Sequence, residues 1–215
     1  MKPLLPQITS ELSEMIEARG NLRAFQPEEM VFFEGDEALF LHVVKSGRVK
    51  MVHMLDAGKE VIIGIFGEGE MFAVPPVFDG KRYPSSAIAM ETTRLLLIHR
   101  PDFLTLLRES SEFAFAVIEW MSEMLREKTA TIQNLATPSP EHRVGTVLLK
   151  LAEPQERKLP VRITLRREDI GRIAGLTTET TIRVVRRFAE KELLRIEHGK
   201  IFIDDTEPLR RFVRR

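Results

Sequence analysis

The stretch that decides the fold is ITLRREDIGRIAGLTTETTIRVVRRFAEKELLRIEHGKIFIDD, residues 163–205. Its apolar spacing predicts one helix over about 167–174 and a second over about 178–191. The intervening GLT includes Gly175, which provides the backbone freedom that a tight helix–helix turn needs. The segment LLRIEHGKIFI then predicts a two-stranded wing around 198–199. The whole stretch is therefore predicted to be a winged helix-turn-helix.

Polar side chains lie near the start of the second predicted helix, where a recognition helix meets the edges of base pairs. Arg183 can donate two hydrogen bonds to guanine O6 and N7, and Glu179 can accept one from cytosine N4. Four residues separate the two, so they share a helix face and can support each other. Together with Thr178 and Thr181, they are the expected base contacts.

The charge distribution indicates which part of the chain meets DNA. The net charge is 0, but residues 138–215 contain 18 Lys+Arg and 12 Asp+Glu, whereas residues 1–137 contain 14 and 20. A solvated charged face is the alternative interpretation. The turn, the caps and the wing favour double-stranded DNA, with steep salt dependence. The expected phosphate contacts are Arg166, Arg167, Arg172, Arg186, Arg187 and Lys191.

Composition excludes several classes of protein. The 215 residues include no cysteine, which excludes disulfides, thiolate zinc sites, cysteine-ligated iron–sulfur clusters and a cysteine nucleophile. No Walker loop, G-x-S-x-G, H-E-x-x-H or dinucleotide fingerprint is present, so an enzyme is not expected. No apolar run approaches the roughly 20 residues of a membrane span, and the start does not resemble a secretory signal. The expected location is the cytoplasm, with no membrane contact.

The first part of the chain has a different texture. Short β-branched and aromatic runs separated by glycine occur between about 26 and 99, and this spacing is typical of an antiparallel sandwich or barrel. In VKMVHML (49–55), alternation predicts a half-buried strand. The sequence therefore predicts a β domain over residues 1–110.

A long helix is predicted from about 111 to 135. One apolar stripe repeats at heptad spacing, which favours a dimer with a coiled-coil seam. A buried helix of a monomer is the alternative. The seam residues are Ala114, Ile118, Met121, Leu125, Lys128, Ile132 and Leu135, and a second stripe comprises Phe113, Val117, Trp120 and Met124. TPSP (137–140) then predicts a hinge. The dimerisation helix and hinge thus span 111–137, and the DNA-binding domain spans 138–215.

This order of elements resembles the CRP/FNR family of bacterial transcription regulators. The resemblance rests on FFEGDEALFLHVVKSGRVKMV (32–52) and on ITLRREDIGRIAGLTTETTIRVVRRF (163–188). It implies an α+β fold with an N-terminal antiparallel β-roll like a cyclic-nucleotide-binding jelly roll, a long dimerisation helix and a C-terminal winged helix-turn-helix. It also implies a homodimer that reads an inverted repeat, and contact with RNA polymerase if the protein is an activator. The family's Glu-x-x-x-Arg is present as Glu179 and Arg183, implying a GA step in each half-site, whereas Thr178 and Ile182 depart from the flanking residues of known branches.

The same resemblance bears on the effector. Cyclic-nucleotide-binding members hold ribose with a Gly-Glu pair and the cyclic phosphate with Arg-Ser/Thr-Ala. Here 73–74 read Ala-Val and 85–87 read Ser-Ser-Ala, and a buried phosphate needs a cationic partner. Arg82 is near, on the same loop. Cyclic AMP is therefore disfavoured. The expected effector pocket between the roll and the long helix comprises Phe72, Val74, Ser85, Ser86 and Thr129.

The cofactor is unknown, and haem is one open possibility. Residues 72–87 are loosely similar to nitric-oxide-responsive, DNR-like members of the family, and some members sense carbon monoxide. The absence of cysteine excludes the cluster-binding FNR type. Candidate haem ligands are His42, His53 and His99. A different small molecule is a second possibility, and a regulator that needs no effector is a third.

Overall fold

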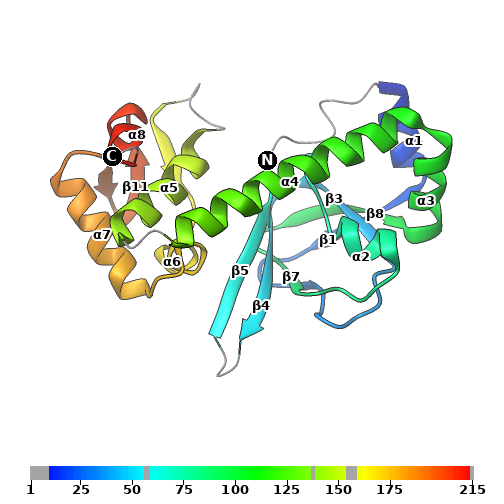
Figure 1. Cartoon of the computed structure of the whole chain (residues 1–215), viewed down its shortest axis with the longest axis horizontal. Helices are drawn as coiled ribbons and strands as arrows, with labels where there is room; N and C mark the ends of the chain where they lie inside the picture. The colour runs from blue at the N-terminus through cyan, green and yellow to red at the C-terminus, as the bar shows by residue number, and fades with distance from the viewer. Residues whose placement is uncertain (1–9, 56–58, 137–138, 154–158, 214–215) are drawn as a thin grey trace. The chain divides into compact units, whose positions relative to one another are not determined.

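The computed structural model describes residues 10–55, 59–136, 139–153 and 159–213 (Figure 1). The chain divides into two compact units, Met1–Lys128 and Thr129–Arg215. The division falls within the helix α4 (Ser111–Ala136), so this helix contributes residues to both units. Part of the predicted hinge, residues 137–138, lies outside the described residues.

The first unit is built on two four-stranded antiparallel sheets. One has the order β1-β8-β3-β6, and the other has the order β2-β7-β4-β5. Strands far apart in the sequence pair within each sheet, as in β1 with β8. This arrangement confirms the predicted antiparallel β-roll. The strands are β1 (Gly20–Phe25), β2 (Met30–Phe32), β3 (Phe40–Ser46), β4 (Val49–Leu55), β5 (Lys59–Phe66), β6 (Met71–Phe72), β7 (Ser86–Ala89) and β8 (Thr93–His99).

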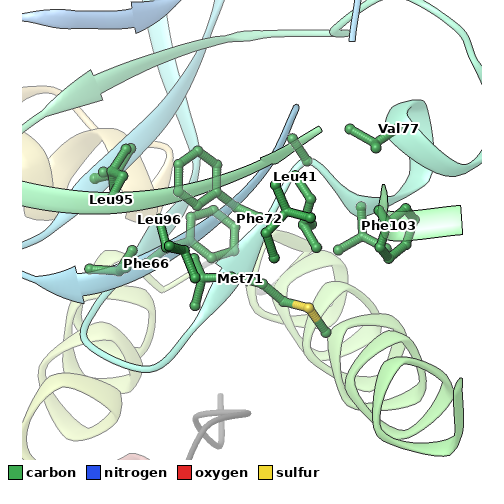
Figure 2. Packing of buried hydrophobic residues seen from close by; sticks show 14 of the residues in the cluster. Leu41, Phe66, Met71, Phe72, Val77, Leu95, Leu96 and Phe103 are labelled. Carbon is green, nitrogen blue, oxygen red and sulfur yellow. The ribbon is translucent and has the colours of Figure 1, made fainter. Parts of the chain in front are cut away.

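Apolar side chains from several of these strands form the core of the first unit. Figure 2 shows Leu41, Met71 and Phe72 packed together, with Phe103 nearby on α3. Burying such side chains is the main stabilising contribution to a fold of this kind. The helices of this unit are α1 (Ser10–Ala18), α2 (Val74–Asp79), α3 (Arg100–Glu109) and the first part of α4.

Strand β4 departs from the sequence-based prediction. Its first four residues, 49–52, are all buried, whereas Met54 and Leu55 are exposed. The predicted alternation is therefore wrong. The strand lies between β7 and β5 and is covered on both faces over its first half. Lys50 is buried as a consequence, and its Nζ lies 3.7 Å from carboxylate oxygens of both Glu28 and Glu60.

The two apolar stripes of α4 have different environments. Phe113, Val117 and Trp120 of the second stripe are buried in the core of the first unit. The heptad seam lies on the solvent side of the chain: Ile118 is 58% exposed, Leu125 69% and Ile132 68%. A single chain therefore leaves these three seam residues uncovered.

The second unit is a winged helix-turn-helix, as predicted. The turn joins α6 (Arg167–Ala174) to α7 (Thr178–Glu190), and the wing is the hairpin of β10 (Arg195–Glu197) and β11 (Lys200–Ile203). A third strand, β9 (Val161–Ile163), pairs with β11. The helices α5 (Pro140–Ala152) and α8 (Glu207–Val213) complete the unit. Across the described residues of both units, no helix combines the length and apolar character needed to cross a membrane.

Candidate nucleic-acid interface and effector site

Local capping fixes the geometry of the helix-turn-helix. Gly175 ends α6 in the left-handed conformation with φ 63°, and its N–H donates to the Gly171 carbonyl. The side chain of Thr177 caps α7, accepting a hydrogen bond of 3.2 Å from the Thr180 N–H. The two helices also pack closely, because a Cβ built on Gly171 would lie 2.7 Å from Thr181 Oγ1. The start of α7 is therefore held in a defined orientation on α6.

Thr181 does not lie on the exposed face of α7. It is fully buried, and its Oγ1 donates a hydrogen bond of 3.0 Å to the Thr177 carbonyl. It shares the packed side of the helix with Val184, Val185 and Phe188. The prediction that Thr181 contacts a base is therefore wrong. The physical reason is helix rotation, which turns this position toward α6.

The remaining three predicted base contacts are exposed to solvent. Thr178, Glu179 and Arg183 are all exposed. Within the ranges that the structure describes, neither Glu179 nor Arg183 has a hydrogen-bond or salt-bridge partner. The expected mutual support of this pair is therefore not present in the unbound chain. Both side chains are free to bind the edges of bases.

The predicted phosphate contacts fall into two groups. Arg166 and Arg186 are exposed and have no ionic partner in the described part of the chain. The others have partners within the unit. Arg167 donates to the Gly199 carbonyl (2.8 Å), Arg172 bonds Glu168 (2.7 Å), Arg187 bonds Glu141, and Lys191 lies over the Phe212 ring (5.1 Å to its centroid). The ion pairs of Arg172 and Arg187 are at least partly exposed, and such pairs contribute little to stability.

Three of the predicted effector residues lie in the interior of the first unit. Phe72, Val74 and Ser85 are fully buried, and the Ser85 hydroxyl has no hydrogen-bond partner among the described residues. Ser86 is half-buried, and its Oγ accepts a hydrogen bond of 2.9 Å from the Glu34 N–H. Thr129 is exposed on α4 and belongs to the second unit.

Aromatic rings fill the interior around Phe72. The ring centroids of Phe66 and Phe72 are 5.4 Å apart, and those of Phe72 and His42 are 4.9 Å apart. Phe32 continues the contact, 5.1 Å from His42 and 3.7 Å from Tyr83. We call these five residues the aromatic file. No local sequence pattern indicates it, because its members come from four strands and a loop.

Burial sets the protonation of the polar members of the aromatic file. His42 is 2% exposed, and burial lowers its pKa from 6.5 to about 3, so the imidazole is neutral at physiological pH. Its Nδ1 has no hydrogen-bond partner in the described part of the chain. Burial raises the pKa of Tyr83 to about 12, and its hydroxyl donates a hydrogen bond of 2.9 Å to the Phe40 carbonyl. The interior is therefore uncharged around Phe72.

Among the described residues, the interior around Phe72 lacks the unpaired cationic side chain that a buried phosphate requires. Ala73, where the resemblance places glycine, adopts the left-handed conformation with φ 62°. Arg82 is exposed, and its Nη1 donates a hydrogen bond of 2.6 Å to the Gly35 carbonyl. Lys50 is the one buried cation among the described residues of the first unit, and Glu28 and Glu60 already flank it. The roll therefore combines a left-handed turn at Ala73 with Val74, an apolar side chain that cannot bind an anion.

The candidate haem ligands do not fit a haem. His53 Nδ1 lies 2.9 Å from a carboxylate oxygen of Glu34 at a partly exposed position, and His99 is exposed at the start of α3. His42 is enclosed by the aromatic file, so a macrocycle bound to its Nδ1 would have to displace rings that pack against it. In the described parts of the chain, no three potential ligands gather as a metal site. The three histidines therefore offer a haem no place in the roll.

Comparison with known protein families assigns both units to one family. The description "Cyclic nucleotide-binding domain" matches residues 22–110, and "Crp-like helix-turn-helix domain" matches residues 142–212. The chain belongs to the CRP/FNR family of transcription regulators. Its DNA-binding role and its status as a regulator rather than an enzyme follow from this membership, and both confirm the predictions from sequence.

Relatives within the CRP/FNR family match along most of the chain. The cyclic AMP receptor protein of Thermus thermophilus is 27% identical over 204 residues, covering 95% of this chain and 93% of that protein. The transcriptional activator protein Anr of Pseudomonas protegens is 29% identical over 216 residues, covering 95% and 86%. A solved structure of a CooA mutant from Carboxydothermus hydrogenoformans shares the fold with a TM-score of 0.80 at 18% identity, covering 99% of this chain and 96% of that one.

Proposed function

We propose that this CRP/FNR member is a homodimer that binds an inverted-repeat operator through α7. The observation that carries the proposal is the exposed face of α7, where Glu179 and Arg183 have no partner within the described ranges. Arginine binding guanine and glutamate binding cytosine fit a GA step in each half-site. Thr178 is the third expected base contact, and Arg166 and Arg186 lead the expected phosphate contacts. A cytoplasmic location and, for an activator, contact with RNA polymerase accompany this function.

The uncovered seam of α4 supports the homodimer. Ile118, Met121, Leu125 and Ile132 are exposed apolar side chains at heptad spacing. Such a stripe is stable in water when a second helix covers it. Two copies of α4 provide that cover by symmetry, and the resulting dimer presents two recognition helices to two half-sites.

We further propose that the controlling signal is not cyclic AMP. The relative from Thermus thermophilus is named a cyclic AMP receptor protein. In this chain, Val74 and Ser85 occupy the positions of the two charged anchors, and both are buried in an uncharged interior. The candidate effector site remains the group around Phe72, Val74, Ser85 and Ser86 in the first unit.

A second candidate is a regulator that needs no effector. The packing of the aromatic file favours it, because the rings already occupy the interior around Phe72. In such a protein, the amount of dimer rather than a ligand determines how much operator is bound. A haem-dependent regulator has no support in the positions of the three candidate histidines.

The experiment that tests the DNA-binding proposal is selection of bound sequences from a random DNA pool with the purified full chain. We expect an inverted repeat with a GA step in each half-site. Because the chain has no cysteine, a Met121→Cys variant supplies one thiol per protomer for a matched test of the seam. We expect oxidation to give a covalent dimer that still binds the selected DNA. A single unrepeated site, or no enriched sequence, would contradict the proposal.

A further inference from the structure

A lysine interrupts the apolar seam of α4. Lys128 occupies a heptad position between Leu125 and Ile132. A charged side chain in such a seam lowers the stability of the coiled coil, because closing the seam removes the ammonium from water. Two copies of the helix would also bring two ammonium groups together at this level. A closed seam therefore needs an acceptor that draws Lys128 aside.

A β-bulge in β5 supplies that acceptor. The pairing of β4 with β5 shifts at one point, where Gly64 faces Met51 but Ile62 faces Val52. Ile63 is therefore the extra residue, and the ladder is interrupted at this position. Lys128 Nζ donates a hydrogen bond to the Ile63 carbonyl oxygen. The bulge and the seam lysine thus meet in one contact within the first unit.

Packing in the roll interior fixes the place of this carbonyl. A Cβ built on Gly64 would lie 2.9 Å from Cε2 of Phe66 and 3.9 Å from Lys128 Nζ. Phe66 is buried, so its ring has little room to give way. Its other neighbour is Phe72, which stacks on His42 in the aromatic file. The Ile63 carbonyl that binds Lys128 therefore precedes a glycine that Phe66, a member of the aromatic file, leaves no room to enlarge.

We propose that Lys128 is a positioning residue that couples β5 to the self-association of α4. With β5 in place, the Ile63 carbonyl holds the ammonium at the edge of the seam, and two copies of α4 pack together. When β5 shifts, the ammonium returns to the seam and opposes the same group on the partner helix. The inference rests on the proposed homodimer and adds a route by which the packing of the roll acts on dimerisation.

The test is a double-mutant cycle on the full chain, read as the dimer dissociation constant by sedimentation equilibrium. Gly64→Ala places a methyl group against Phe66 and displaces β5, so we expect at least tenfold weaker dimerisation. Lys128→Met removes the charge that needs the carbonyl. In the K128M background, Gly64→Ala should therefore change the dissociation constant less than twofold. Equal effects of Gly64→Ala in both backgrounds, or no effect in either, would overturn the coupling.

Arg126→Met is the matched control. Arg126 lies on the same helix, off the seam, and pairs with Glu123. In the R126M background, Gly64→Ala should still weaken the dimer at least tenfold. A loss of the Gly64→Ala effect in this background would contradict a specific role of Lys128, since any cation on the helix would then suffice.

Hydrogen exchange keeps the proposal testable if Gly64→Ala does not fold. Lys128→Met should raise the exchange of amides in residues 60–66 at least threefold, whereas Arg126→Met should leave them unchanged. Equal exchange in the two variants would overturn the contact as a determinant of β5. A wild-type protein that stays monomeric would contradict the homodimer itself, which is a different result from a dimer that is indifferent to Gly64 and Lys128.

Discussion

The recognition helix and the roll interior differ in how their polar side chains are placed. On α7, Glu179 and Arg183 are exposed and lack partners in the described ranges. In the roll, His42 and Ser85 also have polar atoms without partners there, but both side chains are buried. The face of α7 that we propose to meet DNA is therefore open, whereas the interior of the roll is filled by the protein's own rings.

This difference supports the proposal that the chain binds DNA as its family does but does not respond to cyclic AMP. The helix α7 retains the Glu-x-x-x-Arg spacing that suits base recognition. The roll has a left-handed backbone at Ala73, but no charged side chain at the positions where the resemblance places the partners of a cyclic phosphate. Family membership therefore supports DNA binding directly, and the effector has to be argued from the side chains of this chain.

The largest expected effect comes from breaking the proposed dimer, which would present two copies of α7 to DNA. Met121→Glu with Leu125→Glu places two carboxylates in the seam, so we expect monomers and at least a hundredfold loss of operator affinity. Sedimentation and fluorescence anisotropy measure the two outcomes. Ser122→Glu with Arg126→Glu adds negative charge to the same turns off the seam and should leave a dimer. A double seam variant that still binds the operator would show that α4 does not hold the dimer.

The next largest effect tests the exposed face of α7. Arg183→Ala should lose about 1–3 kcal/mol of discrimination at one guanine per half-site. Anisotropy titrations with operators substituted at each position measure this change. Arg187→Ala is the matched control, because Arg187 bonds Glu141 and is expected to meet only phosphate. If Arg183→Ala weakens every sequence equally, Arg183 contacts phosphate rather than a base.

The buried interior of the roll predicts a specific dependence of stability on pH. Burial holds the pKa of His42 at about 3, against an ordinary value of 6.5. Between these values the unfolded chain takes up a proton that the folded chain does not, so stability falls as pH falls from 6.5 toward 3. The slope of this contribution approaches about 1.4 kcal/mol per pH unit.

Urea unfolding of His42→Phe between pH 7 and pH 4 measures this dependence. The variant should lose the His42 contribution, whereas His53→Phe should retain it, because His53 is partly exposed beside Glu34. Identical pH dependence in the wild type and in His42→Phe would show that the imidazole is not held neutral by burial.

The smallest effect concerns the wing. Arg167→Ala removes the hydrogen bond of 2.8 Å to the Gly199 carbonyl, worth about 0.5–1.5 kcal/mol. We expect faster amide exchange over residues 195–203 and a modest, sequence-independent loss of operator affinity. Arg162→Ala, on the exposed side of β9, is the control and should leave the wing unchanged. Unchanged exchange in Arg167→Ala would show that this contact does not hold the wing.

Local signals explain why the DNA-binding unit was predictable. The predicted bounds of the first helix agree with α6, because Gly175 ends it and Thr177 begins the next helix through short-range contacts. The heptad spacing of α4 likewise separated the buried stripe from the exposed one. The prediction that Thr181 contacts a base was wrong because each step along a helix turns the side chain by about 100°. A polar residue can therefore face the core although its neighbours in the sequence are exposed.

Long-range contacts explain what the sequence did not predict. The aromatic file brings together side chains whose positions run from Phe32 to Tyr83, and no local pattern relates them. The burial of Lys50 depends on strands on both sides of β4. The contact between Lys128 and Ile63 depends on a bulge, which only the register of two strands defines.

Operator binding with and without cyclic AMP tests most directly whether the chain binds DNA specifically without responding to cyclic AMP. The purified 215-residue chain is titrated onto the selected operator and onto a scrambled sequence, at one salt concentration. We predict specific binding that cyclic AMP changes less than twofold, because no cation among the described residues lies ready for its phosphate in the interior. Binding that becomes specific only after cyclic AMP is added, with a gain of tenfold or more, would contradict this account.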